Sequence, residues 1–465
     1  KKVVNVVYVG IAAYLLDISL DCVHEAINRQ FNKKPKAVEL NNAAADAGYA
    51  WAEEVLSSQS NYVIRPCKKA AGKILIEGNQ ATALGLLFGG FHMAAWYPIT
   101  PSTSVVEYLA RYARKYRSDP ETGKATYAIV QAEDELAAIG MVLGAGWAGA
   151  RSVTATSGPG ISLMAEMAGL SYFAEIPAVI VDVQRMGPST GLPTRNSQGD
   201  IAKAYYLSHG DCRHVLLIPG NVQECYEFAV KALDLAEQLQ TLVFLMTDLD
   251  FGMNSWMADP FPAPAGPLER GKVLDAEALA KVEDWGRYRD IDGDGVPYRT
   301  LPGTPHPNAA YFTRGTGHDE YARYSEKPAV WQGNMDRLLR NFDTARTLAP
   351  KPVVDVVKGA EVGIIAYGSS DPAVQVARDM LLCNHGLKTN YLRLRALPMN
   401  EDVRTFIERQ KIVYVVEQNR DAQVKGILLT EYPQLGTRLD SVLHYTGIPI
   451  DAESIAEKII EKYGQ

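Results

Sequence analysis

The sequence is organised around residues 94–103, AAWYPITPST. Pro98 and Pro101 each fix φ at about −65° and push the preceding residue towards extended backbone, so we expect a rigid turn. The turn places four hydroxyl side chains, between residues 100 and 104, at the start of a helix predicted over residues 105–116. Such hydroxyls usually cap a helix, although the free N–H groups and the dipole there also suit an anion. On this stretch alone, the capped turn is the preferred interpretation.

The composition is that of an ordinary globular protein. The chain has 465 residues, 47% of them hydrophobic and 22% charged, which is enough for about two to four domains. Its net charge of −7 gives no basic footprint and argues against a nucleic-acid partner. The longest apolar stretch, residues 81–97, is short for a membrane span and contains His92, and the first residues show no signal-peptide pattern. We therefore expect no membrane association and a cytoplasmic location.

The five cysteines are widely scattered, and no two form a Cys-x-x-Cys pair. This usage favours a reducing compartment and buried thiols. It speaks against an iron–sulfur or zinc site held by this chain alone. His306 and His318 lack the spacing of zinc ligands, so we interpret them as hydrogen-bonded loop residues.

Residues 1–71 look like the end of a domain followed by a linker. Residues 3–16 suit either a strand or a helix of small residues, and residues 19–31 have the period of an amphipathic helix. An alanine-rich helix is expected at residues 41–56, and the polar residues 57–72 are the predicted linker. Such a piece, at about sixty residues, is marginal as a free domain.

Residues 72–258 alternate in the manner that predicts βαβ units and a parallel sheet. Strands are expected at residues 125–132, 152–156, 178–183, 213–219 and 242–247, and helices at residues 136–146, 161–173, 201–206 and 222–239. Ligands of such sheets bind outside the carboxyl ends of the strands. Three loops there have specific compositions: QAEDE (131–135), SGPG (157–160) and QRMGPSTG (184–191).

The remaining residues divide into an arm and a second domain. Residues 259–352 are rich in Pro, Gly, Tyr and Arg without sustained periodicity, which predicts an irregular arm between domains or subunits. Within it, residues Asp290–Gly295 (DIDGDG) match the opening of a calcium loop, but Leu301 stands where a bidentate Glu is needed. We therefore prefer a polar turn to an ion site.

Residues 353–465 again alternate, with strands expected at 362–368, 389–394 and 412–417 and helices at 372–383, 401–410 and 452–463. This second, smaller α/β domain has few polar clusters, which indicates packing and docking rather than chemistry.

Two side chains in the strand-end loops are the best candidates for chemistry. Residues 133–135 (EDE) stand between a strand and a helix, where the dipole stabilises acids, so two of the three need no further explanation. Glu133, at the strand end, is the one expected to project into a crevice. Arg185 follows an apolar strand, and its planar fork can bind both oxygens of a carboxylate. The residues alone thus predict an α/β protein with an anion-binding crevice.

Four motifs occur in a specific order: YPITPS (97–102), QAEDE (131–135), ATSGPG (155–160) and QRMGPSTG (184–191). Together they resemble the α subunit of 2-oxoacid:ferredoxin oxidoreductases, most closely the 2-oxoglutarate type. Residues 1–71 resemble the end of the γ domain that some members fuse ahead of α. The resemblance implies a thiamine-enzyme-like, pyrimidine-binding parallel-sheet domain (72–258), the arm (259–352) and a transketolase-C-like α/β domain (353–465).

The resemblance also implies a reaction and a site. The reaction is the thiamine-diphosphate-dependent oxidative decarboxylation of a 2-oxoacid to acyl-CoA and CO2, with electrons passed singly to ferredoxin, and it is reversible in principle as reductive carboxylation. Glu133 would hydrogen-bond the aminopyrimidine ring, with Pro98 and Ile99 also at the cofactor, and burial would perturb this carboxyl. Thr100 and Arg185 would bind the 2-oxoacid carboxylate.

Other parts of the enzyme are expected on a β subunit. In the family, Mg²⁺, the diphosphate motif and the 4Fe-4S cluster belong to that partner; residues 293–295 (GDG) mimic half of the motif but lie in the arm rather than after a strand. The chain is therefore expected to be inactive alone and to work with coenzyme A in a dimer of αβ heterodimers. The alternatives are another substrate (pyruvate or a branched-chain 2-oxoacid), a ferredoxin-independent transketolase-like enzyme, and a non-catalytic scaffold subunit.

Overall fold

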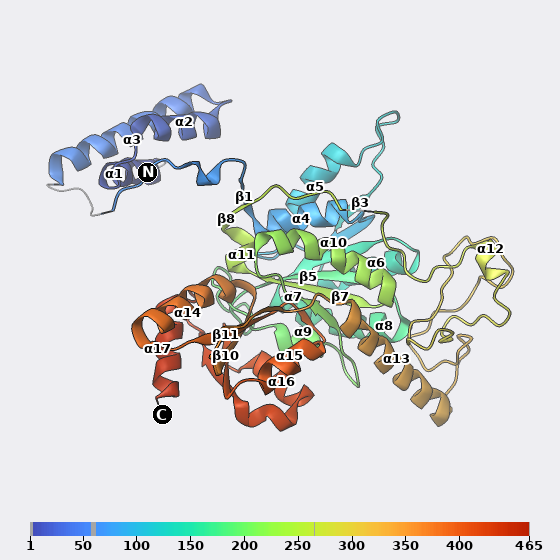
Figure 1. Cartoon of the computed structure of the whole chain (residues 1–465). Helices are drawn as coiled ribbons and strands as arrows, with labels where there is room; N and C mark the ends of the chain where they lie inside the picture. Colours follow the sequence, from blue (N-terminus) through green and yellow to red (C-terminus); the bar gives the residue numbers. More distant parts are fainter. Residues whose placement is uncertain (1–2, 57–61, 265, 465) are drawn as a thin grey trace. The chain divides into compact units, whose positions relative to one another are not determined.

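The computed structural model describes residues 3–56, 62–264 and 266–464, and it divides into two compact units, Lys1–Lys73 and Ile74–Gln465 (Figure 1). The first unit contains helices α1 (Val4–Leu15), α2 (Leu20–Phe31) and α3 (Pro35–Val55) and the short 3-10 helix η1 (Lys68–Ala70). Residues 3–16 are thus helical rather than extended. α1 and α3 cross at Gly10 and Gly48, where a β-carbon on either glycine would collide with the backbone of the other helix. Residues 57–61 of the predicted linker lie outside the described residues.

The second unit contains a seven-stranded sheet in the order β12-β6-β7-β5-β4-β2-β3. Its strands are β2 (Met93–Trp96), β3 (Ala128–Gln131), β4 (Ser152–Thr156), β5 (Ala178–Gln184), β6 (Val215–Leu217), β7 (Leu242–Asp248) and β12 (Ala396–Leu397). The strand pairs are parallel except β12 with β6. The parallel sheet predicted for residues 72–258 is therefore confirmed, with one short strand added from the C-terminal part of the chain.

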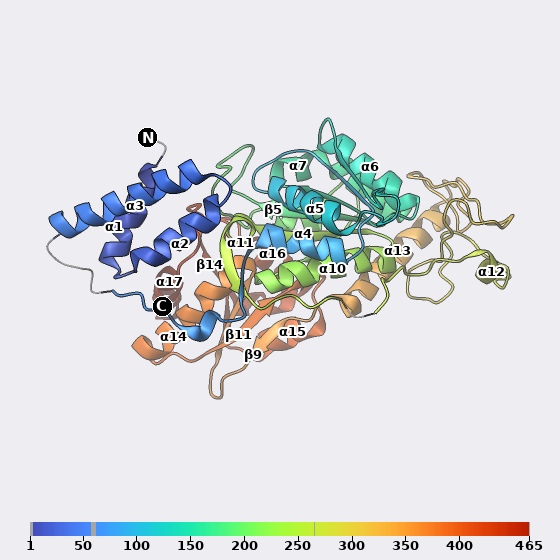
Figure 2. The ribbon, with the colours of Figure 1, turned by 90° about the horizontal axis from the view of Figure 1, so that it is seen from above.

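Helices cover both faces of this sheet. Val179, Val181 and Val183 of β5 belong to one hydrophobic core, whereas Ala178 and Ile180 belong to another, as the alternation of a strand requires. The first core is covered by α4 (Gly78–Phe88), α5 (Thr103–Tyr116) and α10 (Val222–Leu239), and α4 lies beside α10 (Figure 2). The second is covered by α6 (Glu135–Trp147), α7 (Gly158–Leu163), α8 (Ala165–Ala174) and α9 (Ile201–Tyr205). After β7 the chain forms α11 (Leu249–Met253). A two-stranded antiparallel sheet of β1 (Ile74–Glu77) and β8 (Ser255–Ala258) lies outside the main sheet.

The segment 259–352 is not irregular throughout. It contains the single-turn helix α12 (Ala276–Leu279) and the long helix α13 (Pro328–Leu348), which the sequence did not predict. Several positions that α13 buries are polar, namely Asn334, Arg337 and Asn341, so the apolar period that announces a helix is missing. Arg337 forms an ion pair with buried Glu175, which explains how a charged residue can occupy such a position.

A five-stranded sheet forms the C-terminal domain, in the order β14-β13-β10-β11-β9. Its strands are β9 (Val353–Asp355), β10 (Val362–Tyr367), β11 (Thr389–Leu394), β13 (Ile412–Glu417) and β14 (Leu439–Leu443). Its helices are α14 (Asp371–His385), α15 (Glu401–Glu408), α16 (Gln423–Glu431) and α17 (Ala452–Tyr463), with 3-10 turns η2 (Gly368–Ser370) and η3 (Pro433–Arg438). One hydrophobic core runs from the seven-stranded sheet into this domain, so the two α/β domains pack directly on each other.

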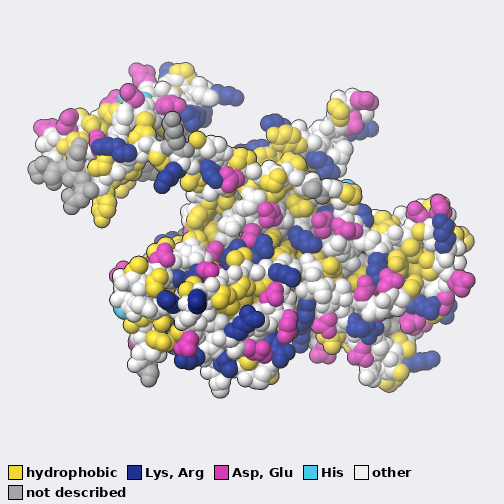
Figure 3. Space-filling view, viewed as in Figure 1, with side chains coloured by type: hydrophobic (Ala, Val, Ile, Leu, Met, Phe, Trp, Pro, Cys, Tyr) yellow, Lys and Arg dark blue, Asp and Glu magenta, His cyan; other side chains and the backbone are white. Residues whose placement is uncertain are grey.

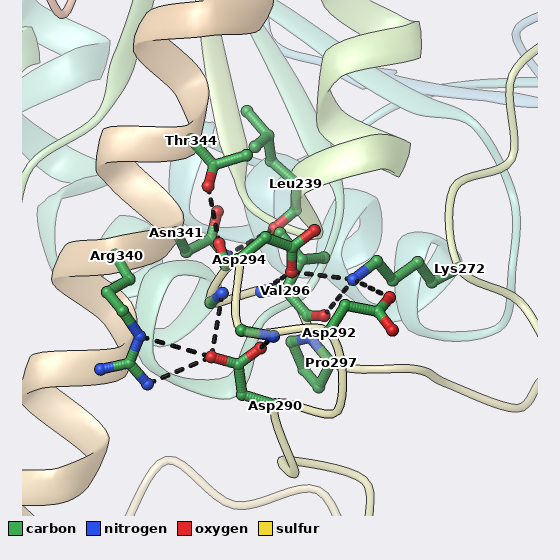
Figure 4. Close-up of polar contacts among 12 residues, drawn as sticks. Leu239, Lys272, Asp290, Asp292, Asp294, Val296, Pro297, Arg340, Asn341 and Thr344 are labelled. Atoms are coloured by element: carbon green, nitrogen blue, oxygen red, sulfur yellow. Dashed lines mark hydrogen bonds and ion pairs between the residues drawn. The ribbon is translucent and has the colours of Figure 1, made fainter.

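The acidic turn at Asp290–Gly295 is folded around two cationic side chains (Figure 4). Asp290 accepts hydrogen bonds from the backbone N–H groups of Gly293 (2.9 Å) and Gly295 (3.0 Å) and forms an ion pair with Arg340. Lys272 Nζ bridges Asp292 (2.7 Å) and Asp294 (2.8 Å). These contacts describe a polar turn whose charges the protein itself compensates.

Charged side chains are interspersed on the molecular surface. On the face shown in Figure 3, Lys and Arg side chains alternate with Asp and Glu side chains, as expected for a small net charge. Within the described ranges, no helix is long and apolar enough to cross a membrane. The same ranges contain no group of three or more His, Cys, Asp or Glu side chains suited to a metal ion.

Candidate functional site

Four loops meet at one edge of the seven-stranded sheet because β3, β2, β4 and β5 are neighbours and run in parallel. The YPITP turn follows β2, the acidic residues 133–135 follow β3, the SGPG turn follows β4, and residues 185–191 follow β5. The carboxyl ends of parallel strands are where such sheets bind ligands. The structure thus gathers all four sequence motifs in one place.

Thr100 and Arg185 are in direct contact. Arg185 Nη1 donates a 2.7 Å hydrogen bond to the Thr100 carbonyl oxygen, although the two residues are far apart in the sequence. Arg185 is only 7% exposed, and within the part of the chain that the structure describes its Nε has no hydrogen-bond partner. A buried guanidinium with an unpaired N–H retains donor capacity for an anion. This geometry suits a carboxylate bound at Arg185, with the exposed Thr100 hydroxyl nearby.

The turn before α5 is held from inside the protein rather than by hydroxyl caps. Asn79 Nδ2, on α4, donates to the Pro101 carbonyl (2.9 Å) and to Ser104 Oγ (2.8 Å). Ser102 Oγ donates to the Ile99 carbonyl (3.0 Å) and accepts no bond from the first turn of α5. The preferred capping interpretation is therefore wrong. Pro98 is exposed and Ile99 half-buried, so both border the site.

The three acids after β3 have three different environments. Asp134 is the N-cap of α6, and its carboxylate accepts the Ala137 N–H at 2.7 Å. Glu133, the residue favoured by the sequence, has an exposed side chain. Glu135 is only 7% exposed and lies beside Gly160, where a β-carbon would collide with Thr156 Oγ1 and lie 3.0 Å from Glu135 Oε1. Glu135, not Glu133, is the carboxyl shielded from water in this chain.

The SGPG turn adds a buried hydroxyl to the same edge. Ser157 is fully buried, and its Oγ has no hydrogen-bond partner among the described residues. It precedes α7, on which Gly158 closely approaches Asp200, because a β-carbon at Gly158 would lie 2.7 Å from Asp200 Oδ1. A residue larger than glycine at position 158 would displace the Asp200 side chain, and one at position 160 would displace Thr156 and Glu135.

A cleft of about 750 Å³ extends from Arg185 to the C-terminal domain. The first domain contributes residues 185–190, the start of α7 and the region around α9, and the C-terminal domain contributes polar and aromatic side chains. The residues that line the cleft and were not predicted from the sequence include Asp200, Lys203, Asn419, Arg420 and Tyr445. No local pattern marks them, since their importance comes from the packing of two domains. One residue near the cleft could have been noticed in the sequence: Asp182 is a charged residue within the mainly apolar strand β5, AVIVDVQ.

Two family models match the chain. Residues 85–262 match the thiamine-diphosphate-binding domain of pyruvate flavodoxin/ferredoxin oxidoreductases. Residues 1–51 match the pyruvate ferredoxin/flavodoxin oxidoreductase model. Both descriptions agree with the resemblance that the four motifs indicated.

Known proteins are similar over most of the chain. The α subunit of 2-oxoacid:ferredoxin oxidoreductase 2 from Aeropyrum pernix is 31% identical over 92% of this chain and 67% of that protein. The 2-oxoglutarate synthase subunit KorA from Methanocaldococcus jannaschii is 46% identical over 74% of this chain and 88% of that protein. A solved structure of 2-oxoglutarate:ferredoxin oxidoreductase from Magnetococcus marinus, with 2-oxoglutarate, coenzyme A and succinyl-CoA bound, has a TM-score of 0.87 at 31% identity and covers 98% of this chain and 77% of that one. This chain therefore belongs to the family of 2-oxoacid:ferredoxin oxidoreductase α subunits.

Proposed function

We propose that the chain is the α subunit of a 2-oxoglutarate:ferredoxin oxidoreductase. The enzyme would convert 2-oxoglutarate and coenzyme A to succinyl-CoA and CO2 while reducing ferredoxin, and it would also run in reverse as a reductive carboxylation. The observation that carries the proposal is the buried Arg185, whose guanidinium contacts Thr100 and keeps an unpaired N–H at the edge of the sheet. The similarity to KorA supports 2-oxoglutarate as the substrate.

The residues at this edge fit thiamine diphosphate. A buried carboxyl (Glu135), a buried hydroxyl without a partner (Ser157) and a turn of small residues lie together, as an aminopyrimidine with several polar atoms requires. When bound, thiamine diphosphate supplies a nucleophilic carbon and an electron sink for the 2-oxo group. Pro98 and Ile99 would line the ring from the turn after β2.

A carboxyl of this chain would hold the proton that the aminopyrimidine exchanges. The prediction from the sequence is Glu133, but the burial of Glu135 favours Glu135 for this role. A shielded carboxyl interacts more strongly with a ring nitrogen than one facing water, because the local dielectric constant is lower. Glu133 stays a prediction, and paired variants of the two residues decide between them.

Arg185 and Thr100 would orient the substrate. The guanidinium would bind the carboxylate next to the 2-oxo group, and the Thr100 hydroxyl would donate to the carboxylate or the carbonyl oxygen. A second carboxylate needs a second partner, since a buried unpaired charge is costly. Lys203 and Arg420, which line the same cleft, are cations within this chain that meet that requirement.

A β subunit would complete the site. We propose that it supplies Mg²⁺, the diphosphate contacts and a 4Fe-4S cluster, and that the enzyme is a dimer of αβ heterodimers. The exposure of Tyr97, Pro98, Thr100 and Glu133 at the sheet edge supports this, because those groups are available for a partner to cover.

The experiment is to express the chain alone and with the β subunit encoded in the same organism. We expect the purified chain to be colourless and to lose thiamine diphosphate on gel filtration. The complex should be brown and should reduce a one-electron acceptor only when a 2-oxoacid and coenzyme A are both present. A panel of 2-oxoacids then identifies the substrate: higher kcat/KM with pyruvate or a branched-chain acid than with 2-oxoglutarate would refute the substrate. Stoichiometric iron or retained thiamine diphosphate in the chain alone would refute the divided site.

A further inference from the structure

The turn that carries Thr100 is anchored by a buried side chain of α4, a helix that covers one face of the sheet. Asn79, in the first turn of α4, is 0% exposed. Its Nδ2 donates hydrogen bonds to the Pro101 carbonyl oxygen (2.9 Å) and to Ser104 Oγ (2.8 Å). Both amide hydrogens of Asn79 are therefore used, and one of the two bonds ends on the turn itself.

The turn depends on side chains because its backbone has few donors. Its two prolines have no N–H, so the turn can form fewer backbone hydrogen bonds than another turn of its length. The Ile99 carbonyl accepts locally, from Ser102 Oγ (3.0 Å) and from the Thr103 N–H (3.1 Å). The carbonyls of Thr100 and Pro101, by contrast, accept from side chains of other segments.

Arg185 and Asn79 hold consecutive carbonyls of this turn. Arg185 Nη1 donates to the Thr100 carbonyl at 2.7 Å, and Asn79 donates to the carbonyl of the next residue, Pro101. Because the ring of Pro101 fixes φ between these two carbonyls, the direction of one restricts the direction of the other. The contact of Arg185 with the turn therefore depends on where Asn79 holds the turn.

Two other side chains at the start of α4 also bond to α5. Glu77 Oε2 accepts a hydrogen bond from Tyr108 Oη at 3.0 Å, and Gln80 donates one to Tyr112 Oη. Within the described ranges, neither of these two side chains forms a hydrogen bond with the turn, whereas Asn79 does. We therefore expect α4 and α5 to stay joined when Asn79 is replaced, and the effect of the replacement to fall on the turn.

We propose that Asn79 is a positioning residue for the 2-oxoacid: its amide fixes the turn so that the Thr100 hydroxyl and the Arg185 guanidinium face the same carboxylate. This role rests on the proposed function, in which those two side chains bind the substrate. Asn79 is fully buried and acts through them. Because a small displacement of binding groups is costly, loss of the amide should raise the KM for the 2-oxoacid by about tenfold. The kcat should change by less than about threefold, and the KM for coenzyme A by less than about twofold.

The first test compares variants of the αβ complex by steady-state kinetics. Asn79→Ala removes both hydrogen bonds and should raise the KM for the 2-oxoacid. Ser104→Ala removes only the bond to α5, and Tyr108→Phe removes only the neighbouring bond to Glu77, so both should leave that KM within about twofold. An unchanged KM in Asn79→Ala would overturn the proposal. An equal rise in all three variants would also overturn it, because the packing of α4 on α5 would then be responsible.

The second test asks whether Asn79 acts through Arg185. Two substitutions that disturb one arrangement have non-additive effects. The double variant Asn79→Ala/Arg185→Lys should therefore lose little more kcat/KM for the 2-oxoacid than Arg185→Lys alone. Additive losses would refute the route through Arg185.

The third test observes the turn without reference to activity. Crystal structures of the unmodified and Asn79→Ala complexes should show the Thr100 carbonyl displaced from Arg185 Nη1, and an unmoved turn would overturn the proposal. If Asn79→Ala does not assemble, Gly252→Ala replaces it in all three tests with the same expected direction, because its β-carbon would lie 2.8 Å from Asn79 Oδ1 and press on the amide. If the turn moves but the unmodified complex oxidises no 2-oxoacid, the proposed function fails and the anchoring of the turn by Asn79 stands.

Discussion

The two sheets of this protein differ in how their carboxyl ends treat buried polar groups. At the end of β13, the Glu417 carboxylate accepts hydrogen bonds from Tyr367 Oη (3.0 Å), Asn419 Nδ2 (3.0 Å) and the N–H groups of Val424 (2.8 Å) and Lys425 (3.0 Å). At the ends of β4 and β5, by contrast, the hydroxyl of Ser157, the carboxylate of Asp182 and one N–H of Arg185 lack hydrogen-bond partners in residues 3–56, 62–264 and 266–464.

This difference separates a structural end from a functional one. Fully satisfied polar networks rigidify a protein, whereas unsatisfied groups mark places where a ligand or a proton completes the arrangement. The C-terminal domain was expected to carry few polar clusters, and that expectation is wrong. A buried network of Gln198, Asn196, Gln418 and Ser369 ties the two α/β domains together. Its role is docking, as its satisfied hydrogen bonds indicate.

The largest expected effect concerns the acids after β3. In the αβ complex, Glu135→Gln should lower kcat by about 100-fold or more, because it removes a charge in a water-excluded site. The matched variant Glu133→Gln should lose less than about tenfold if Glu135 holds this role. Steady-state kinetics with thiamine diphosphate content measured in parallel checks both. The opposite order of effects would assign the role to Glu133.

The next effect concerns Arg185. Arg185→Lys keeps the charge but loses the planar fork and the contact with Thr100, so we expect kcat/KM for the 2-oxoacid to fall by about 10- to 100-fold. Cofactor content should not change. Lys411→Gln serves as the control, because it removes an exposed cation that does not line the cleft. An increase in only the KM for coenzyme A would show that Arg185 belongs to another binding pocket.

Substitution of Glu417, at the carboxyl end of β13, should change the stability of the protein rather than its catalysis. Glu417→Gln replaces an acceptor of four hydrogen bonds with a group that accepts at only one oxygen, so the free energy of unfolding should fall by about 1–3 kcal/mol. The KM for the 2-oxoacid should stay unchanged. Denaturant unfolding of the complex, compared with its kinetics, checks the prediction, and a selective change in KM would contradict the structural role.

The last expected effect is a change in the pH dependence of stability. The pKa of Asp182 is raised in the folded state by burial, so its contribution is fully present below its unfolded pKa and declines as the pH rises towards the folded pKa. Asp182→Asn should remove that decline, so the free energy of unfolding of the variant should fall less between neutral and mildly alkaline pH than that of the unmodified protein. Thermal unfolding of both proteins across the pH range measures this, and equal pH dependence would contradict it.

Local patterns were sufficient for most elements of the two α/β domains. The sequence predicted residues 152–156 and 222–239 with the bounds that β4 and α10 have, because a short strand of small and β-branched residues and an amphipathic helix are recognised from neighbouring residues. The family resemblance implied that Thr100 and Arg185 belong to one site, and in the structure Arg185 donates a hydrogen bond to the Thr100 carbonyl oxygen. Parallel strands bring their carboxyl-end loops together whatever the loops contain.

Only the tertiary structure decided which polar groups are buried and which have partners. The sequence favoured Glu133 because it stands at the strand end, but Glu135 is the buried one, and it lies beside Gly160 of another strand-end turn. α13 escaped prediction because Arg337, at a buried position, is compensated by Glu175, a residue distant in the sequence. Asp200 reaches the end of β5 only through the tertiary fold, where its N–H donates to Gln184 Oε1. The charge state of a side chain depends on its neighbours in space, and those neighbours are set by the packing of segments that no local pattern relates.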